Sequence, residues 1–169
     1  MWVGSCGPSY YRGVVLNDTI LKQGKAGLVV GVIQRRSAIN TNLPSENDPR
    51  DRELFNIYRK HLKTSFVKSG IGYEEGQEKV IVDITIYSYN KGNAFARWLL
   101  PGAGTSRLLV QAAIKKDAVL IGAIESQQSI SWGGGFSIGG WQHVINWSAK
   151  DIGSKICSVL YADTEDSCS

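Results

Sequence analysis

The sequence predicts an α+β protein in which two helices cover one face of a mostly antiparallel sheet, in the order β-α-β-β-β-α. Two amphipathic segments, 48–70 and 142–161, have apolar residues at helical spacing, and the segments around them have the patterns of strands. A tight turn joins the last two strand segments, which should therefore form an antiparallel hairpin. Elements in this order are typical of a two-layer sandwich with the helices on one side.

The first strand and the first helix have the clearest signals. Residues 26–34, AGLVVGVIQ, are apolar and β-branched, which is typical of a strand covered on both faces. Asp48 can cap the helix, Pro49 suits its first turn, and Gly70 can end it. The apolar stripe of this helix consists of Leu54, Phe55, Tyr58, Leu62 and Phe66.

The remaining strands alternate between apolar and polar residues. In segment 78–89 the apolar residues fall on one face, and segment 107–116 behaves in the same way. A tight turn at Lys116-Asp117 leads into segment 118–131. There we expect one face to carry Val119, Ile121 and Ala123 and the other to carry Leu120, Gly122 and Ile124.

Length and composition favour a single folded domain. The chain has 169 residues, of which 43% are hydrophobic and 20% are charged, as in ordinary globular proteins. We divide it into an extended leader or tether (1–25), one α+β domain (26–162) and a polar tail (163–169). The net charge of +4 is too small to indicate a nucleic-acid partner. No apolar run approaches the roughly 20 residues that a membrane-spanning helix needs.

A Gly-x-Ser-x-Gly string at 135–139 raises the question of a serine hydrolase. The nucleophile of such enzymes sits between a strand and a helix that follow each other directly. Ser137 is instead surrounded by glycines, and the downstream His143 precedes Asp151, which is the wrong order for that triad. We therefore expect a glycine-rich connector and no catalytic residue.

The other candidate sites are equally weak. Segments 24–27 and 101–106 lack the spacing of a phosphate-binding loop. His61 lies between lysines on the polar side of the first helix, where we expect it to be solvated. The three cysteines and the two histidines are too scattered for a zinc site. We expect no cofactor and no metal.

The N-terminal segment contains a lipobox-like string, Val3-Gly4-Ser5-Cys6. An aliphatic residue and two small residues precede a cysteine that would become lipidated, and an extended tether follows it. The apolar region of a secretory signal is missing, which would fit a translation start upstream of Met1. We expect lipidation of Cys6, and the alternative is a free or disulfide-bonded Cys6. With Cys6 acylated, an oxidising periplasm would permit a disulfide between Cys157 and Cys168.

An arginine, a Gly-x-Gly turn, two strands and a glycine-rich loop precede the closing helix. In this combination the chain resembles a bacterial envelope family, the domain of unknown function 4410, over roughly residues 26–160. The hairpin turn is shorter than the Asp-x-x-Thr-Gly turn that is frequent in the family. The matching positions are Arg97, Gly102, Gly104, Arg107, Gly133, Gly134, Gly135, Gly139 and Gly140.

The resemblance implies a secreted or outer-membrane lipoprotein that faces the periplasm and has no known catalytic residues. The fold also resembles small domains of envelope machines, which assemble side by side. We therefore expect a non-enzymatic structural or accessory subunit of an envelope-spanning assembly such as a secretion system. Its partners would be other subunits and the outer membrane, with no nucleic acid. The alternative is a soluble periplasmic binding module for a peptide, a glycan or a small ligand.

Three aromatic residues near the glycine-rich loop, Trp132, Phe136 and Trp141, are candidates for contact with a partner. Aromatic side chains are enriched at protein interfaces. The alternative is that these rings pack against the edge of their own sandwich. The polar face of the sheet is a second candidate contact, because an antiparallel sheet can leave a face or an edge open.

Overall fold

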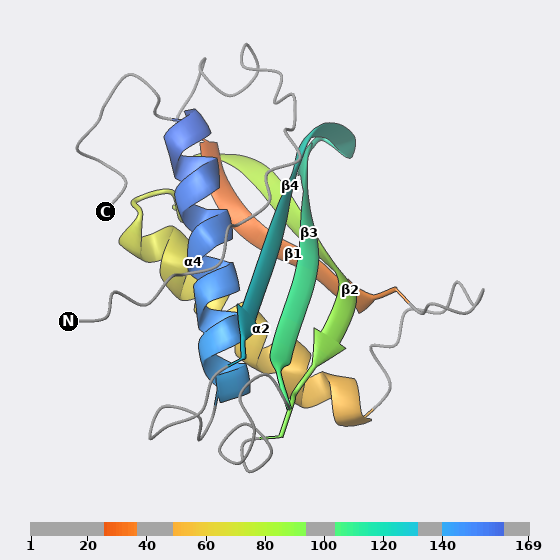
Figure 1. The fold of residues 1–169 in the computed structure, drawn as a ribbon. Helices are drawn as coiled ribbons and strands as arrows, with labels where there is room; N and C mark the ends of the chain where they lie inside the picture. Colours follow the sequence, from red (N-terminus) through yellow and green to blue (C-terminus); the bar gives the residue numbers. More distant parts are fainter. Residues whose placement is uncertain (1–25, 37–48, 94–103, 132–139, 161–169) are drawn as a thin grey trace, which may run out of the picture.

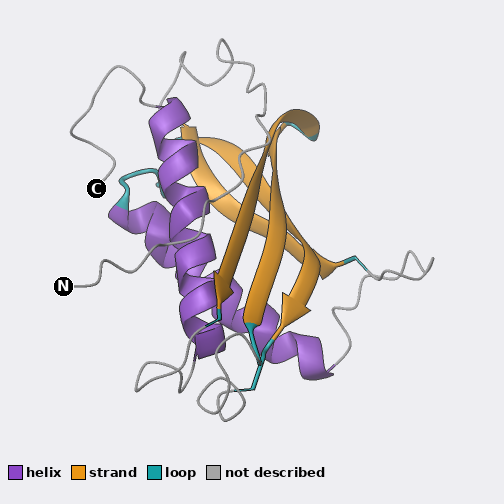
Figure 2. Ribbon diagram, viewed as in Figure 1, coloured by secondary structure: helices purple, strands orange, loops and turns teal. Residues whose placement is uncertain are grey.

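The computed structural model has the predicted element order and the predicted two layers, and it describes residues 26–36, 49–93, 104–131 and 140–160 (Figure 1). Both helices lie on the same side of the sheet (Figure 2). The elements are β1 (Ala26–Arg35), α2 (Pro49–Lys68), β2 (Glu78–Asn90), β3 (Ser106–Lys116), β4 (Val119–Ile130) and α4 (Gly140–Leu160).

The sheet has the order β1-β2-β3-β4, with β1 parallel to β2 and the other neighbours antiparallel. Two parallel strands need a crossover connection, and α2 supplies it. The register pairs Ala26 with Glu78 and Val80 with Lys116, so β1 begins at the end where β3 turns into β4. We call this the hairpin end, and the opposite end, where β1 and β2 finish, the loop end (Figure 1).

The core lies between the sheet and the two helices. The predicted inward faces of β2, α2 and the last helix are confirmed, because their apolar side chains are buried. Burial of this much apolar surface supplies the main favourable free energy of folding. The fully buried side chains of the core include Val80, Val82, Ile84, Ile86, Tyr58, Leu62, Ile145, Ile152 and Ile156.

The expectation that β1 is covered on both faces is wrong for the described part of the chain. Val32 is 48% exposed, and no described helix lies on the side of the sheet opposite α2 and α4. A register shift between Val30 and Ile33 turns both of these residues toward the core. The continuous apolar run therefore reflects a β-bulge, which disrupts the alternation, and not burial on two faces.

Side chains from the sheet and from the helical layer both form hydrogen bonds with the bulge in β1. Asp83 Oδ1, on the open face of β2, accepts a hydrogen bond from the backbone N–H of Val32 at 2.8 Å. Arg59 Nη1, on α2, donates to the carbonyl oxygen of Gly31 at 3.0 Å. A Cβ at Gly31 would collide with the side chains of Asp83 and Ile81, so the bulge requires a glycine there.

The predicted hairpin of β3 and β4 is confirmed. The structure corrects its turn residues and shows that different side chains of β4 point toward the core. Lys116 pairs with Val119, so the turn residues are Asp117 and Ala118, with φ of 48° and 65°. Positive φ at both positions is the geometry of a type I′ turn. A second bulge, between Ile114 and Lys115, interrupts the predicted alternation of β4. As a result Ile121, Gly122, Ile124 and Ser126 are buried, whereas Val119 and Leu120 are exposed.

The two helices touch through a buried hydrogen bond and a close backbone approach. The hydroxyl groups of Tyr58 on α2 and Ser148 on α4 lie 3.0 Å apart, and both residues are fully buried. Burial raises the pKa of Tyr58, because the phenolate would lose its hydration. Gly153 faces Ser65, where an added Cβ would meet the serine side chain.

The variant Ala118→Gly should raise the free energy of unfolding by about 1 kcal/mol, because glycine adopts positive φ without the steric cost that alanine bears. Denaturant unfolding followed by circular dichroism measures the change. Ala123→Gly is the matched control, since Ala123 lies within the extended part of β4 and glycine should destabilise it there. Equal effects of the two substitutions would contradict the type I′ turn.

The variant Tyr58→Phe should cost about 1–2 kcal/mol, because it leaves the Ser148 hydroxyl buried without its partner. The double variant Tyr58→Phe with Ser148→Ala should recover part of that loss. Above pH 10, the ordinary pKa of tyrosine, the unfolded chain ionises before Tyr58 does in the folded state, so wild-type stability falls. The cost of Tyr58→Phe should therefore be smaller at pH 11 than at pH 8, and a larger cost would contradict burial of a neutral phenol.

Candidate functional site

Several residues that the sequence singles out lie outside the described residues. They are Cys6, Cys168, Trp132, Phe136 and Ser137, so lipidation of Cys6 and the partner contacts of Trp132 and Phe136 stay predictions. Three positions of the family pattern are described. Gly104 lies two residues before β3, Arg107 is its second residue and Gly140 begins α4, so all three lie at the loop end.

Trp141 has contacts within its own domain. Its half-buried ring packs against the core, and Lys91 Nζ lies 4.5 Å from the ring centroid. An ammonium group over an indole is attracted by the electron-rich ring face. These contacts match the alternative in which the ring packs on the edge of its own sandwich, and a contact with a partner stays a prediction.

Cys157 is fully buried on α4 and takes part in a disulfide. Its Sγ lies 3.6 Å from the carbonyl oxygen of Ser69, just after the end of α2. The other cysteines are Cys6 and Cys168, both outside the described residues. A thioether-linked Cys6 cannot also form a disulfide, so lipidation of Cys6 requires Cys168 as the partner of Cys157.

The two histidines lie on different helices, His61 on α2 and His143 on α4. His61 is partly exposed, and burial together with Lys60 lowers its pKa. His143 is exposed, with its ring centroid 6.0 Å from that of Trp147. In the described part of the chain no three His, Cys, Asp or Glu side chains gather where they could hold a metal ion.

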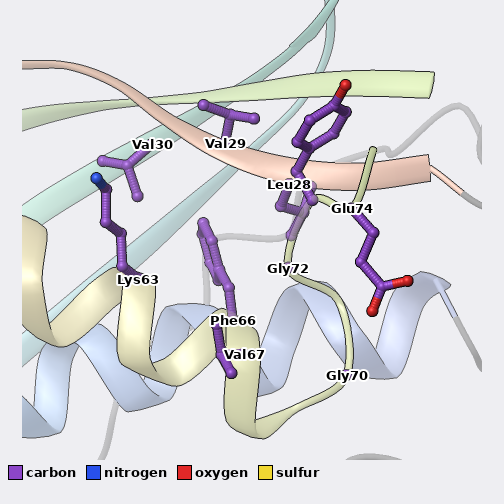
Figure 3. Close-up of a pocket in the computed structure, with 10 residues that line it drawn as sticks. Leu28, Val29, Val30, Lys63, Phe66, Val67, Gly70, Gly72 and Glu74 are labelled. Carbon is purple, nitrogen blue, oxygen red and sulfur yellow. The ribbon is translucent and has the colours of Figure 1, made fainter. Parts of the chain in front are cut away.

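A pocket of about 360 Å³ lies at the hairpin end, between β1, the last turns of α2 and the segment that follows the helix (Figure 3). Gly70, with a φ of 66°, lets the chain leave α2 and run beside β1. The backbone N–H of Leu28 donates a hydrogen bond to the carbonyl oxygen of Ile71 at 2.9 Å, and the carbonyl oxygen of Leu28 accepts one from the N–H of Tyr73 at 3.2 Å. The pocket is lined by Leu28, Val29, Val30, Lys63, Phe66, Val67, Gly70, Gly72, Tyr73 and Glu74.

The lining of this pocket is mostly apolar, and its charged groups do not converge. Lys63 and Phe66 extend from α2 toward β1, whereas the carboxylate of Glu74 points away from the strand (Figure 3). A general acid–base pair or an activated nucleophile needs its groups within hydrogen-bond reach of each other. The pocket has the size of a small-ligand site but lacks such a pair.

The hairpin end also carries most of the large apolar side chains that are exposed among the described residues. Seven large apolar side chains are exposed among the described residues, and five of them lie on or beside the hairpin end. Single exposed apolar residues are common on soluble proteins, but a local concentration marks an interaction site. The five are Val67, Tyr73, Ile81, Val119 and Leu120.

The loop end carries exposed cations beside aromatic rings. The guanidinium of Arg36 lies 5.4 Å from the ring centroid of Tyr87, and Lys91 lies over Trp141. Arg107 is exposed and pairs with Asn90 across β2 and β3. Most of the exposed large apolar side chains of the described residues thus lie at the hairpin end, whereas cation–π pairs occur at both ends. Within the described residues, no helix is both long and apolar enough to span a membrane.

Comparison with known proteins gives one family and a shared fold. A profile of the family described as Domain of unknown function (DUF4410) matches residues 38–134, which is more than half of the chain. No curated protein matches the chain in sequence. The structures with the same fold have low sequence identity, so the likeness concerns the fold alone.

One similar structure is the PelC dodecamer from Paraburkholderia phytofirmans, with 8% identity, a TM-score of 0.50, and coverage of 82% of this chain and 90% of that chain. Another is a minor lipoprotein from Acinetobacter baumannii, with 9% identity, a TM-score of 0.38, and coverage of 82% of this chain and 92% of that chain.

The disulfide of Cys157 should join it to Cys168 in the protein isolated from its native compartment. Peptide mapping by mass spectrometry without reduction identifies the partner directly. Cys168→Ser should then leave Cys157 as a buried thiol that reacts with alkylating agents only after unfolding. A peptide that links Cys157 to Cys6 would contradict both this pairing and lipidation of Cys6.

Proposed function

Because this chain belongs to the family described as Domain of unknown function (DUF4410), we propose that it is a non-enzymatic lipoprotein of the outer membrane whose domain faces the periplasm. The observation that carries the proposal is the string Val3-Gly4-Ser5-Cys6 before the tether and the domain. Acylation of Cys6 would supply the anchor. A single acyl chain binds a membrane weakly, but the several chains of a mature lipoprotein hold stably.

The proposed role is that of a structural or accessory subunit in an envelope-spanning assembly such as a secretion system. The fold that the chain shares with the PelC dodecamer supports packing of several copies side by side. The face of the sheet opposite the helices offers a surface for such contacts, because its residues Asp83, Thr85 and Gln111 are only half-buried. Other subunits of the assembly would be the partners.

The domain is proposed to bind and not to catalyse. Lys63 and Glu74 are the charged side chains of the described pocket, and Glu74 points away from the strand (Figure 3). Ser126 Oγ, on β4, is buried and has no hydrogen-bond partner among the described residues. A hydroxyl without a base and without access to substrate cannot act as a nucleophile.

A periplasmic binding module for a peptide, a glycan or a small ligand is the second candidate, and the pocket beside β1 favours it. A largely apolar cavity of a few hundred Å³ with a few polar groups is the usual form of a ligand site. Mass spectrometry of the protein under native conditions, after isolation from its own compartment, distinguishes the two candidates. A co-purifying ligand that is lost on Phe66→Ala would favour the binding module.

The anchor is tested by measuring the intact mass of the protein isolated from the membrane fraction after expression from its native locus. The expected mass is that of a chain that begins at an acylated Cys6. Cys6→Ala should remove the modification and shift the protein to the soluble fraction, since the anchor would be lost. An unmodified chain that begins at Met1 and stays in the soluble fraction would contradict the proposal.

A further inference from the structure

We infer that the hairpin end of the domain is a membrane-contacting surface, with Val119 and Leu120 inserted into the interface of a phospholipid bilayer. The inference rests on the proposed lipoprotein function and deepens it, because it states which end of the domain faces the membrane. It concerns a surface that is separate from the acylated cysteine.

The hairpin tip exposes two adjacent apolar side chains. Val119 is 62% exposed and Leu120 is 60% exposed, directly after a tight turn that projects from the end of the sheet (Figure 1). Neighbouring strand residues point to opposite faces, so the pair presents apolar surface on both sides of the hairpin. A bilayer interface can cover both sides of such a tip at once, whereas a flat partner surface would cover one.

The apolar surface continues from the tip across the open face of the sheet. Leu120 pairs with Lys115, Lys115 with Ile81, and Ile81 with Val29. Residues directly opposite each other in a sheet lie on the same face. Leu120, Ile81 and Val29 therefore form one row along the hairpin end, interrupted by a single lysine stem.

The N-terminal segment enters the domain at the hairpin end, and this position indicates that the partner of that end is a membrane. Residues 1–25, which contain Cys6, lead into Ala26 at the hairpin end. Ala26 pairs with Glu78, two residues before Val80, and Val80 pairs with Lys116 at the base of the tip. A lipid on Cys6 would therefore tether the domain by the end that carries its exposed apolar residues, which makes a lipid surface the nearest large partner.

The sheet lysines at the hairpin end are paired with carboxylates or lie over an aromatic ring. We therefore expect this end to bind a bilayer without a strong preference for anionic lipid. Lys115 pairs with Asp83 and Lys116 with Glu78, each at 2.8 Å. Lys79 lies over the ring of Tyr73, 5.2 Å from its centroid. Lysine stems and tyrosine rings cover apolar surface while their polar ends stay in water, as at membrane interfaces.

The test uses the full chain with Cys6→Ser, so that no acyl chain contributes to binding. Flotation with vesicles of phosphatidylethanolamine and a minor share of phosphatidylglycerol measures the partition coefficient. We expect Val119→Thr with Leu120→Thr to lower it about tenfold, because both substitutions reduce apolar area and threonine keeps the strand propensity. Leu120→Trp should raise the coefficient, since tryptophan favours the interface.

The matched control is Val32→Thr, which changes an exposed valine on β1 away from the tip. It should leave the partition coefficient unchanged. Equal losses from Val32→Thr and from the tip substitutions would overturn the inference, and so would equal flotation of the tip variant and the Cys6→Ser parent. The partition coefficient should also change little with salt, because the tip lysines are already paired.

A second copy of the chain is the other occupant that the same surface could take. Analytical ultracentrifugation of the Cys6→Ser parent and of its tip variant decides this point. Self-association that disappears in the tip variant, with vesicle binding unchanged, would replace the membrane by a copy of this chain. The intact mass tests acylation separately, so the failure of the anchor and the failure of the tip contact remain distinguishable.

Discussion

The parallel pairing of β1 with β2 is the constraint on which the rest of the molecule depends. Because the two strands run in the same direction, the chain must return along the helical layer, and α2 makes that return. With α2 and α4 on one side, the opposite face of the sheet has no described cover. The same pairing brings Ala26 to the end where β3 turns into β4, so the chain joins the domain at its hairpin end.

Three groups outside the strand ladder bond to the backbone of β1. The segment after α2 satisfies the backbone of Leu28, Arg59 binds the carbonyl of Gly31, and the side chain of Asp83 binds the next backbone N–H. Edge strands that leave such groups unpaired recruit other chains. The segment after α2 thus blocks the addition of a further strand at Leu28.

Most of the fold could be predicted because its signals are local. The alternation in β2 and the stripes of both helices each report which face is buried, and the structure confirms them. Which side chains of β4 point toward the core could not be predicted. The bulge opposite Lys115 depends on the pairing register of β3 and β4, which the sequence of one strand does not reveal. In the same way, periodicity does not reveal that Gly31 and Asp83 share a bulge, since these residues lie far apart in sequence.

The candidate site was less accessible to sequence reasoning than the fold. The aromatic residues near the glycine-rich loop attract attention by composition, whereas Val119 and Leu120 look like ordinary strand residues. Their exposure goes with their place directly after the turn at Asp117-Ala118, whose two residues have positive φ. A signal was present in the sequence Lys-Lys-Asp-Ala at 115–118, which stands directly before two large apolar residues.

We propose that the hairpin end, with its exposed apolar residues, faces the membrane and that the loop end faces away. Hydrogen exchange of the acylated full chain, compared in detergent and on vesicles, tests it most directly. We predict slower exchange on vesicles at the tip that contains Val119 and Leu120 and no change near Lys91 and Arg107. Slower exchange near Lys91 and Arg107, with the tip unchanged, would contradict the account and reverse the orientation of the domain.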